Sequence, residues 1–439
     1  MECDMAGGKL VQWLKRINVV LFCVVLVACG GGSSGEAIGT DDTIEVPRET
    51  TETIGDNKYT TIQRQANLGE LRYSSISAEE FITQYFLLAG QVSSTQFMLS
   101  EPQTFVIPEN TVSFSLNFNN PLAGNDVFVG ELENPSGVKI SLWDLIPCFS
   151  GTCSMVMPNR PNALYQPEAG EWKYSVLAEK SAVEHGHLNN ASINMLIRTN
   201  DFPQGQGGLD ATLRVQPYYT GGTTSLDAVS SIMNSLATIF LINNIGLDWL
   251  PAKHIVPNAF STMIPDYSDV KTQVLMAYGE ANVINVYFVE GFEEEQEGAG
   301  ALVHPGMSEE VRAIIGIAAG IPGSLGTKGD ANGVMVALGV GHEGQFEARS
   351  YLEVAETAAH EIGHFLGLFH TTERSGGVDP LPDTPNCNEE RPDDGALPSA
   401  DECPDGHNLM FPIAREDGEL GITLTADQRF VLANSPMAQ

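Results

Sequence analysis

Apolar and polar residues alternate in short runs through the first half of the chain. These runs, broken by Pro, Gly and Asn, recur between residues 104 and 199. Alternation with a period of two places apolar side chains on one face of a strand, so each run predicts a half-buried strand. The predicted strands cover 104–108, 111–118, 125–132, 137–143, 171–179 and 192–199. Strands at this spacing predict an antiparallel β-sandwich, preceded by a helix over 75–93.

The hydrophobic period becomes helical after residue 222. Apolar residues recur three and four positions apart over 225–243, which predicts a long helix with a broad apolar face. A capping box, Ser350 with Glu353, predicts the start of a second amphipathic helix. Further helices are predicted over 267–279 and 425–434, and strands over 283–292, 312–323 and 332–339, the last as the edge strand beside a cleft. The second half is therefore predicted to be an α+β domain with a small mixed sheet, preceded by the all-β sandwich.

The first 28 residues have the pattern of an export signal. Three basic residues precede a mostly apolar run over 17–28, and Cys29 follows at once. The run is too short to span a bilayer and suits the core of a secretory signal. Residues 26–29 (LVAC) resemble the lipobox of bacterial lipoproteins, in which the signal is removed before the cysteine and that cysteine is acylated. The alternative is an ordinary signal or short anchor with an incidental cysteine.

The lipobox resemblance implies a protein of the bacterial cell envelope. It would be anchored through Cys29 to a membrane, expected to be the outer membrane, and would be periplasmic or at the cell surface. We predict four segments: a signal peptide over 1–28, a flexible tether over 29–60, a β-sandwich over 61–215 and the α+β domain over 216–439. The tether prediction comes from GGGSSG and an acidic, Thr-rich stretch, and the last boundary from a glycine-rich change of composition between 201 and 222.

Composition excludes one class of partner. The chain has 439 residues, of which 42% are hydrophobic, enough for two or three packed domains. Its formal net charge is −34, and it lacks the clustered Lys and Arg that bind a phosphate backbone, so no nucleic-acid partner is expected.

The cysteine count agrees with export. Seven cysteines are present, and loss of the signal with lipidation of Cys29 leaves four in two close pairs. We predict disulfides between Cys148 and Cys153 and between Cys387 and Cys403, as in an oxidising compartment. If both form, no thiol remains that could bind a metal and hold an enzyme inactive.

The candidate chemistry lies in residues 360–370, HEIGHFLGLFH. His360 and His364 are four positions apart, so on a helix they project from one face and can share a metal ion. Glu361 can reach a water held by that ion without being a ligand. Gly367 can adopt positive φ and end the helix, which lets His370 approach the same metal. Three nitrogen ligands and one open position are typical of a catalytic zinc.

HExxHxxGxxH, followed by Met410, resembles the metzincin zinc metalloproteases, in which a methionine turn lies beneath the metal. HTTE after the third histidine, DTP at 383–385, and the cysteines before Met410 are similar to the pappalysin-type group. The sandwich, with NPSG and PEAGEWKYSV, resembles prepeptidase-type domains of secreted bacterial proteases. The metzincin resemblance implies zinc, endopeptidase activity on proteins or peptides, and an extended substrate paired with an edge strand.

The resemblance implies a second metal site, and the chain departs from the family pattern at one position. In pappalysins the loop after the third histidine can hold calcium, which implies Asp379 or Asp383 as ligands here. In several such families a tyrosine two residues after the turn methionine supports the transition state, whereas this chain has Pro412. Stabilisation of the oxyanion must then depend on zinc or on another group.

These residues predict metal-assisted peptide hydrolysis with Glu361 as general base. Two alternatives stay open. One is a surface-tethered binding or adhesion protein in which the sandwich recognises a partner and the zinc is structural. The other is a zinc hydrolase that acts on a non-peptide amide.

Overall fold

The computed structural model describes residues 48–54, 57–65, 72–73, 97–119, 127–141, 153–180, 192–200, 209–222, 224–267, 269–293, 314–329, 332–342, 345–372, 378–387, 400–413 and 421–439. The predicted signal, Cys29, the helix over 75–93 and Cys148 lie outside these residues. No described helix is both long and apolar enough to span a membrane.

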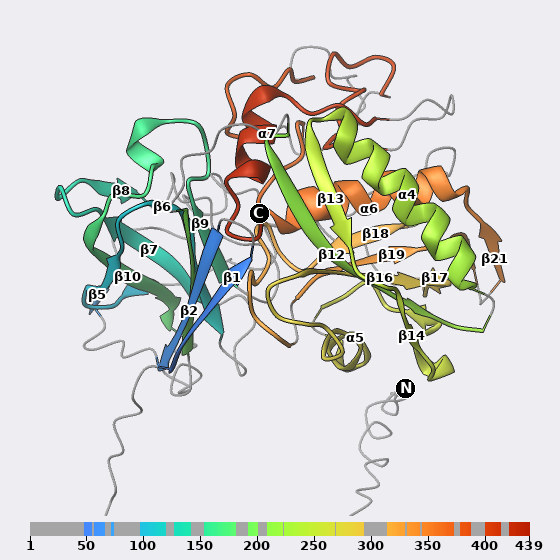
Figure 1. The fold of residues 1–439 in the computed structure, drawn as a ribbon, viewed down its shortest axis with the longest axis horizontal. Helices are drawn as coiled ribbons and strands as arrows, with labels where there is room; N and C mark the ends of the chain where they lie inside the picture. The colour runs from blue at the N-terminus through green and yellow to red at the C-terminus, as the bar shows by residue number, and fades with distance from the viewer. Residues whose placement is uncertain are drawn as a thin grey trace, which may run out of the picture. The chain divides into compact units, whose positions relative to one another are not determined.

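The N-terminal part is a β-sandwich of two antiparallel sheets (Figure 1). The first sheet has the order β1 (Arg48–Ile54), β2 (Asn57–Gln65), β11 (Ser192–Asn200), β6 (Thr111–Asn119) and β9 (Cys153–Met157). The second has the order β3 (Arg72–Tyr73), β4 (Phe97–Leu99), β10 (Gly170–Glu179), β7 (Val127–Glu133) and β8 (Lys139–Ser141), with β5 (Gln103–Ile107) also paired to β10. A short 3-10 helix, η1 (Ala163–Tyr165), precedes β10.

Alternation along the strands builds the sandwich core. Phe114, Leu116 and Phe118 on β6 and Trp172 and Tyr174 on β10 are all buried in one cluster. The rings of Phe114 and Trp172 meet edge to face with centroids 5.2 Å apart. All six strands predicted from the alternating pattern are confirmed, with bounds that differ by a few residues.

The prediction of a tether up to residue 60 is wrong from Arg48 onward. Strands β1 and β2 pair along their whole length, and β2 also pairs with β11. The side chains of β1 from Glu49 to Thr53 are exposed, so this edge strand needs no apolar run, and threonine favours the extended backbone. Low hydrophobicity here marks an edge strand instead of a disordered spacer.

The C-terminal part is an α+β domain built on a mixed sheet. Its strand order is β13 (Ile245–Trp249), β12 (Ala211–Thr220), β16 (Ile284–Val289), β19 (Val334–Ala337) and β18 (Gly316–Ala318), with β14 (Lys253–Ile255) also paired to β12. All pairs are parallel except β18 with β19. Small pairs lie beside it: β15 (Thr262–Met263) with β17 (Gly291–Phe292), and β20 (Gly339–His342) with β21 (Gln345–Ala348).

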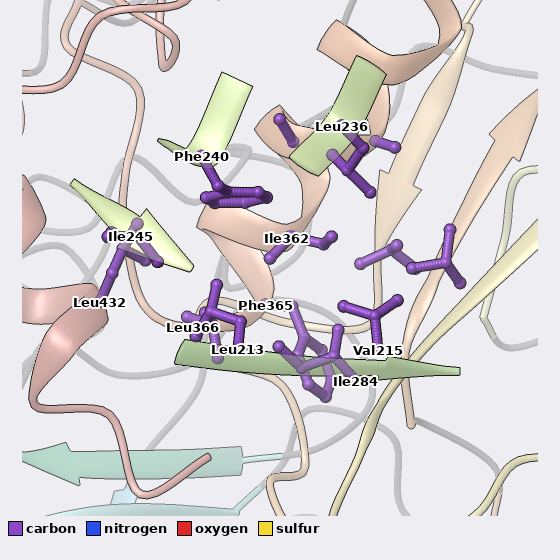
Figure 2. Close-up of a cluster of buried hydrophobic side chains, with 14 of the residues drawn as sticks. Leu213, Val215, Leu236, Phe240, Ile245, Ile284, Ile362, Phe365, Leu366 and Leu432 are labelled. Atoms are coloured by element: carbon purple, nitrogen blue, oxygen red, sulfur yellow. The ribbon is translucent and has the colours of Figure 1, made fainter. Parts of the chain in front are cut away.

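Helices cover both faces of this sheet. Helices α4 (Leu226–Ile242) and α6 (Tyr351–Phe365) share one hydrophobic cluster with Val286 and Phe288 of β16. Figure 2 shows this core, where Leu236 and Phe240 of α4 and Ile362 of α6 lie over the strands. Residues of β16 that point the other way share a second cluster with α5 (Val270–Met276) and η3 (Asn258–Phe260). The predicted fold class, a sandwich followed by a small mixed sheet with an active-site helix, is confirmed.

Two further predictions are wrong, one for a domain boundary and one for the edge strand beside the cleft. Strand β12 runs through the predicted boundary at 215/216 and belongs entirely to the second sheet, so the sandwich ends with β11. The glycine-rich segments before and after β12 have the composition of a linker, so the sequence pattern did not indicate this buried strand. The edge strand of the sheet is β18, not the segment 332–339, because β19 pairs with β16 on one side and β18 on the other. All four residues of β19 are buried, as expected for an interior strand.

A buried arginine joins the sandwich to the C-terminal segment. Arg198 of β11 is 1% exposed, and Nη1 donates to the carbonyls of Ser435 and Ala438 at 2.9 and 2.8 Å. Its Nη2 donates to the carbonyl of Ala433, the last residue of α7 (Ala426–Ala433), at 3.1 Å. The guanidinium therefore satisfies carbonyls that a helix C-terminus leaves unpaired. Burial lowers the pKa of Arg198 to about 10, so it stays charged at neutral pH.

We predict that Arg198→Met lowers the free energy of unfolding by at least about 3 kcal/mol, because three buried carbonyls lose a charged donor. Urea unfolding measures this. Arg214→Ala is the control, since Arg214 Nε lies 3.8 Å from Asp248 Oδ2 in a partly exposed ion pair and should cost less than about 1 kcal/mol. Equal effects of the two substitutions would contradict the role given to Arg198.

Candidate metal centre

Helix α6 carries the first two histidines of the motif. It begins at the predicted capping box: Ser350 Oγ accepts from the Glu353 N–H at 3.2 Å, and Glu353 Oε2 accepts from the Ser350 N–H at 2.8 Å. It ends after Phe365, and Gly367 has φ of 110°, which a glycine adopts without strain. The chain can therefore turn back, and His370 comes to lie beside the helix. The predicted helix start and glycine turn are confirmed.

The three imidazoles converge on one point. His370 Nε2 lies 3.3 Å from His360 Nε2 and 3.1 Å from His364 Nε2. Ligands about 2.05 Å from a tetrahedral zinc are about 3.3 Å apart, so the spacing is that of a shared zinc ion. All three side chains are almost fully buried, at 1%, 0% and 3% exposure for His360, His364 and His370. Their donor atoms form a group of metal-ligating type.

The other ring nitrogens fix the direction of two of these side chains. His360 Nδ1 lies 2.7 Å from the Leu409 carbonyl, and His364 Nδ1 lies 2.7 Å from the Leu368 carbonyl. A carbonyl only accepts, so Nδ1 carries the proton and donates, and the Nε2 lone pair faces the shared point. Both rings are thus oriented with Nε2 available as a metal ligand.

Burial also keeps these imidazoles unprotonated. Burial, followed by the neighbouring His370, lowers the pKa of His360 to about 3. Burial, followed by His360 and His370, lowers the pKa of His364 well below its usual value. A metal cation therefore meets little competition from protons at neutral pH.

Glu361 lies against the edge strand. Its side chain is fully buried, and a Cβ built on Gly316 of β18 would lie 2.7 Å from Glu361 Oε1 and 2.6 Å from Thr357 Cγ2. Any larger residue at position 316 would therefore displace the carboxylate or the strand. Tyr267 braces the same strand, because its hydroxyl donates to the Ile317 carbonyl at 2.8 Å. Burial, followed by the nearby Glu361, raises the pKa of Tyr267 well above its usual value.

The register of β18 leaves two residues with outward-facing peptide groups. The Ala337 N–H donates to the Ile315 carbonyl, and the Ala319 N–H donates to the Gly333 carbonyl, both towards β19. Because pairing alternates in antiparallel strands, the peptide groups of Gly316 and Ala318 point away from β19. Among the described strands, none pairs with β18 on that side.

Met410 lies against helix α6 at Gly363. It is fully buried, and a Cβ built on Gly363 would lie only 2.5 Å from Met410 Sδ. The glycine between the two helical histidines therefore lets the thioether approach the backbone of α6. The Met410 carbonyl accepts from the Thr371 N–H at 3.1 Å, directly after His370. Pro412, two residues after Met410, is buried and offers no hydroxyl.

A disulfide joins Cys387 to Cys403 with a Cα–Cα distance of 5.2 Å. It links the loop after His370 to the segment that leads to Met410. Thr372 reinforces this link, since its Oγ1 donates to Asp405 Oδ2 at 2.7 Å and accepts from the Cys387 N–H at 3.0 Å. The bond between the two sulfurs leaves Cys387 and Cys403 unable to act as thiolate ligands. The pair Cys148–Cys153 is not described because Cys148 lies outside the described residues.

The two predicted calcium residues have different surroundings. Asp379 is 7% exposed; its Oδ1 accepts from the Leu381 N–H at 3.2 Å, and the side chains of Thr384 and Gln428 lie close to its carboxyl group. Asp383 Oδ2 accepts from the Asp427 N–H in the first turn of α7 at 3.0 Å. Neither aspartate belongs to a described group of three or more His, Cys, Asp or Glu whose donor atoms converge.

Gly316 and Tyr267 are the residues of this site that the sequence did not indicate. Each approaches Glu361 from a position more than 40 residues earlier in the chain, and neither lies in a recognisable local pattern. The isolated placement of Gly316 inside a short apolar run was the one available signal, since glycine within a strand can mark a close approach.

Comparison with known proteins gives structural likeness only. No family model and no curated protein sequence matches the chain. Among solved structures, archaemetzincin from Methanopyrus kandleri is 15% identical with a TM-score of 0.24, over 53% of this chain and 90% of that one. Metalloproteinase-II from Bacteroides fragilis is 12% identical with a TM-score of 0.23, over 75% of this chain and 84% of that one. Myroilysin is 16% identical with a TM-score of 0.19, over 51% and 92%. TM-scores this low do not establish a family.

Proposed function

We propose that the protein is a zinc-dependent endopeptidase of the metzincin type. One observation carries this proposal: the Nε2 atoms of three buried imidazoles converge, with that of His370 3.3 Å from His360 and 3.1 Å from His364, and helix α6 also carries the buried Glu361. The donor set fits zinc, because three neutral nitrogens leave a fourth position for water or substrate. The pappalysin-type group is the finer assignment, supported by HTTE, DTP and the Cys387–Cys403 disulfide.

The chemistry needs a proton acceptor and a polarised carbonyl. Zinc held by His360, His364 and His370 would polarise the scissile carbonyl and acidify the attacking water. Glu361 accepts a proton from that water at a carboxylate oxygen and then delivers it to the leaving amine. Because Gly316 has no side chain, the Glu361 carboxylate can occupy the space beside β18. Tyr267 holds the strand that carries Gly316, and its buried hydroxyl is already donated to Ile317.

The substrate is proposed to be an extended peptide. The outward-facing peptide groups of Gly316 and Ala318 can hydrogen-bond a substrate strand alongside β18, next to Glu361. Main-chain pairing of this kind favours proteins and peptides over small amides, because a small amide has no strand to add. Mapping cleavage sites in a peptide library would define the residue preference.

We predict that Glu361→Gln lowers kcat by about 10²- to 10⁴-fold and leaves zinc bound, because the amide cannot accept the proton while the three imidazoles are unchanged. Casein hydrolysis and metal analysis of the purified protein measure the two effects. Glu356→Gln is the matched control: Glu356 lies on the same helix, its Oε1 accepts from the Gly421 N–H at 2.6 Å, and a glutamine oxygen can keep that bond. Full activity of Glu361→Gln would exclude Glu361 as the base. Wild-type protein that binds zinc but cleaves no peptide would favour the binding-protein alternative.

Calcium binding at Asp379 is a further part of the proposal. Asp379 Oδ2 and Thr384 Oγ1 are buried oxygens that lie close together, and Asp383 lies in the same loop. Buried oxygens of this kind suit calcium, which takes carboxylate and hydroxyl or carbonyl ligands. Burial raises the pKa of Asp379 to about 7, so without a cation this carboxyl is largely protonated below neutral pH.

We predict that calcium raises the Tm, and that its affinity falls about tenfold per pH unit below pH 7. The sign follows because calcium needs the carboxylate, while a pKa of about 7 means that the folded protein holds a proton there in acid. Melting curves at pH 5.5 and 8, with calcium or with a calcium chelator, test this. Asp379→Asn should abolish the response, and a response that survives in this variant would place calcium elsewhere.

Lipid anchoring at Cys29 is proposed from the sequence LVAC alone. We predict that, in a Gram-negative host, wild-type protein is recovered in the membrane fraction with an acylated N-terminal Cys29. Cys29→Ser should release it to the soluble fraction, because the acyl chains are lost. Mass spectrometry of the mature N-terminus measures the modification, and cleavage at another position would contradict it.

A further inference from the structure

Two buried amide side chains face each other behind the metal centre. Asn408 Nδ2 donates to Gln428 Oε1 at 2.8 Å, and Gln428 Nε2 donates to Asn408 Oδ1 at 3.2 Å. Asn408 is 6% exposed and Gln428 is fully buried. Each amide thus gives and receives a hydrogen bond in a site without water access, where an unpaired donor or acceptor would be costly.

The asparagine side of this pair fixes the turn that contains Met410. Asn408 Oδ1 also accepts from the Met410 N–H at 2.9 Å, two residues on, as in an Asx turn. The Leu409 peptide lies between these two residues, so the turn sets the direction of its carbonyl. That carbonyl accepts from His360 Nδ1 at 2.7 Å. The position of the Asn408 side chain therefore determines the positions of both Met410 and the His360 imidazole.

The glutamine side fixes the pair to helix α7. Gln428 Oε1 also accepts from the Thr425 N–H at 3.0 Å, and the Gln428 N–H donates to Thr425 Oγ1 at 3.2 Å, which completes a capping box. Gln428 cannot change rotamer without breaking both the helix cap and the bonds to Asn408. The start of α7 and the turn at Met410 are thereby held in one register.

We propose that Asn408 and Gln428 are positioning residues of the metal centre. They hold the turn at Met410 in place, and with it the Leu409 carbonyl that orients His360. This rests on the proposed function, and it adds two residues that lie outside the HExxHxxGxxH motif. Neither belongs to the group of donor atoms that converge on the metal position. They act through the hydrogen bond to His360, as outer-shell groups of metal sites do.

Gln428→Glu separates positioning from simple stability. The carboxylate keeps the size of the side chain and still accepts from the Thr425 N–H, but it loses the donor to Asn408 Oδ1. We expect a 10- to 100-fold loss of zinc affinity, measured by competition with a chelating dye. The visible absorption of the cobalt-substituted protein should change, because it reports ligand geometry. We expect kcat to fall with little change in KM, since no substrate contact is lost.

Thr425→Ala is the matched control. It removes the other capping bond of α7 at a cost of about 1 kcal/mol and leaves the Asn408–Gln428 pair in place. We expect a lower Tm with unchanged zinc affinity and cobalt spectrum. If Thr425→Ala reduces zinc affinity as much as Gln428→Glu does, the effect comes from the helix and the proposal is overturned.

Asn408→Asp provides a second, milder variant in case Gln428→Glu does not fold. Its carboxylate still accepts from Met410 and from Gln428 Nε2 but cannot donate to Gln428 Oε1, so we expect a smaller loss of zinc affinity in the same direction. Folded variants with wild-type affinity and cobalt spectrum overturn the proposal for this pair while leaving the proposed function intact. A wild-type protein that binds neither zinc nor cobalt overturns both.

Discussion

Three imidazoles are held with their Nε2 atoms close to one buried point, and most of the surrounding structure serves to keep them there. Lone pairs of nitrogens 3.1 and 3.3 Å apart repel each other unless a cation or a proton lies between them. Burial disfavours the proton, since it lowers the pKa of His360 and His364. The arrangement therefore favours a metal cation, and rigid carbonyl acceptors at Leu409 and Leu368 prevent the rings from turning away.

The supports of this centre come from four separate parts of the α+β domain. Helix α6 provides two ligands and the base, and the turn at Gly367 provides the third ligand. Strand β18 contacts the Glu361 side chain at Gly316, and Met410 packs against α6 at Gly363. A disulfide between Cys387 and Cys403 joins the loop after His370 to the segment that leads to Met410. Helix α6 is itself held by α4 and the sheet, with which it shares one hydrophobic cluster.

The sandwich contributes to the same construction through Arg198. Its guanidinium binds the end of α7, and the start of α7 carries Gln428, which pairs with Asn408 behind the metal centre. Tyr59 of β2 adds a second bond, since its hydroxyl donates to the Ala438 carbonyl at 2.7 Å. Desolvation of a cation without a carboxylate partner is costly, so three carbonyl acceptors are needed to retain it. The sandwich is therefore a structural partner of the C-terminal segment.

The sequence by itself determined the local features. Helices α4, α5, α6 and α7, the capping box of α6 and six sandwich strands follow from periodicity and caps, because these depend on residues a few positions apart. HEIGHFLGLFH likewise specified the histidines, since a helix and one glycine turn bring them together. Tertiary structure alone decided which strand forms the sheet edge, that exposed Thr-rich residues pair as β1 and β2, and that Gly316, Tyr267 and the Asn408–Gln428 pair surround the centre. Apart from the β1–β2 hairpin, these contacts join segments that are distant in the chain, such as Asn57 of β2 with Asn200 of β11. No local pattern encodes which distant partner a strand edge or a buried amide will meet.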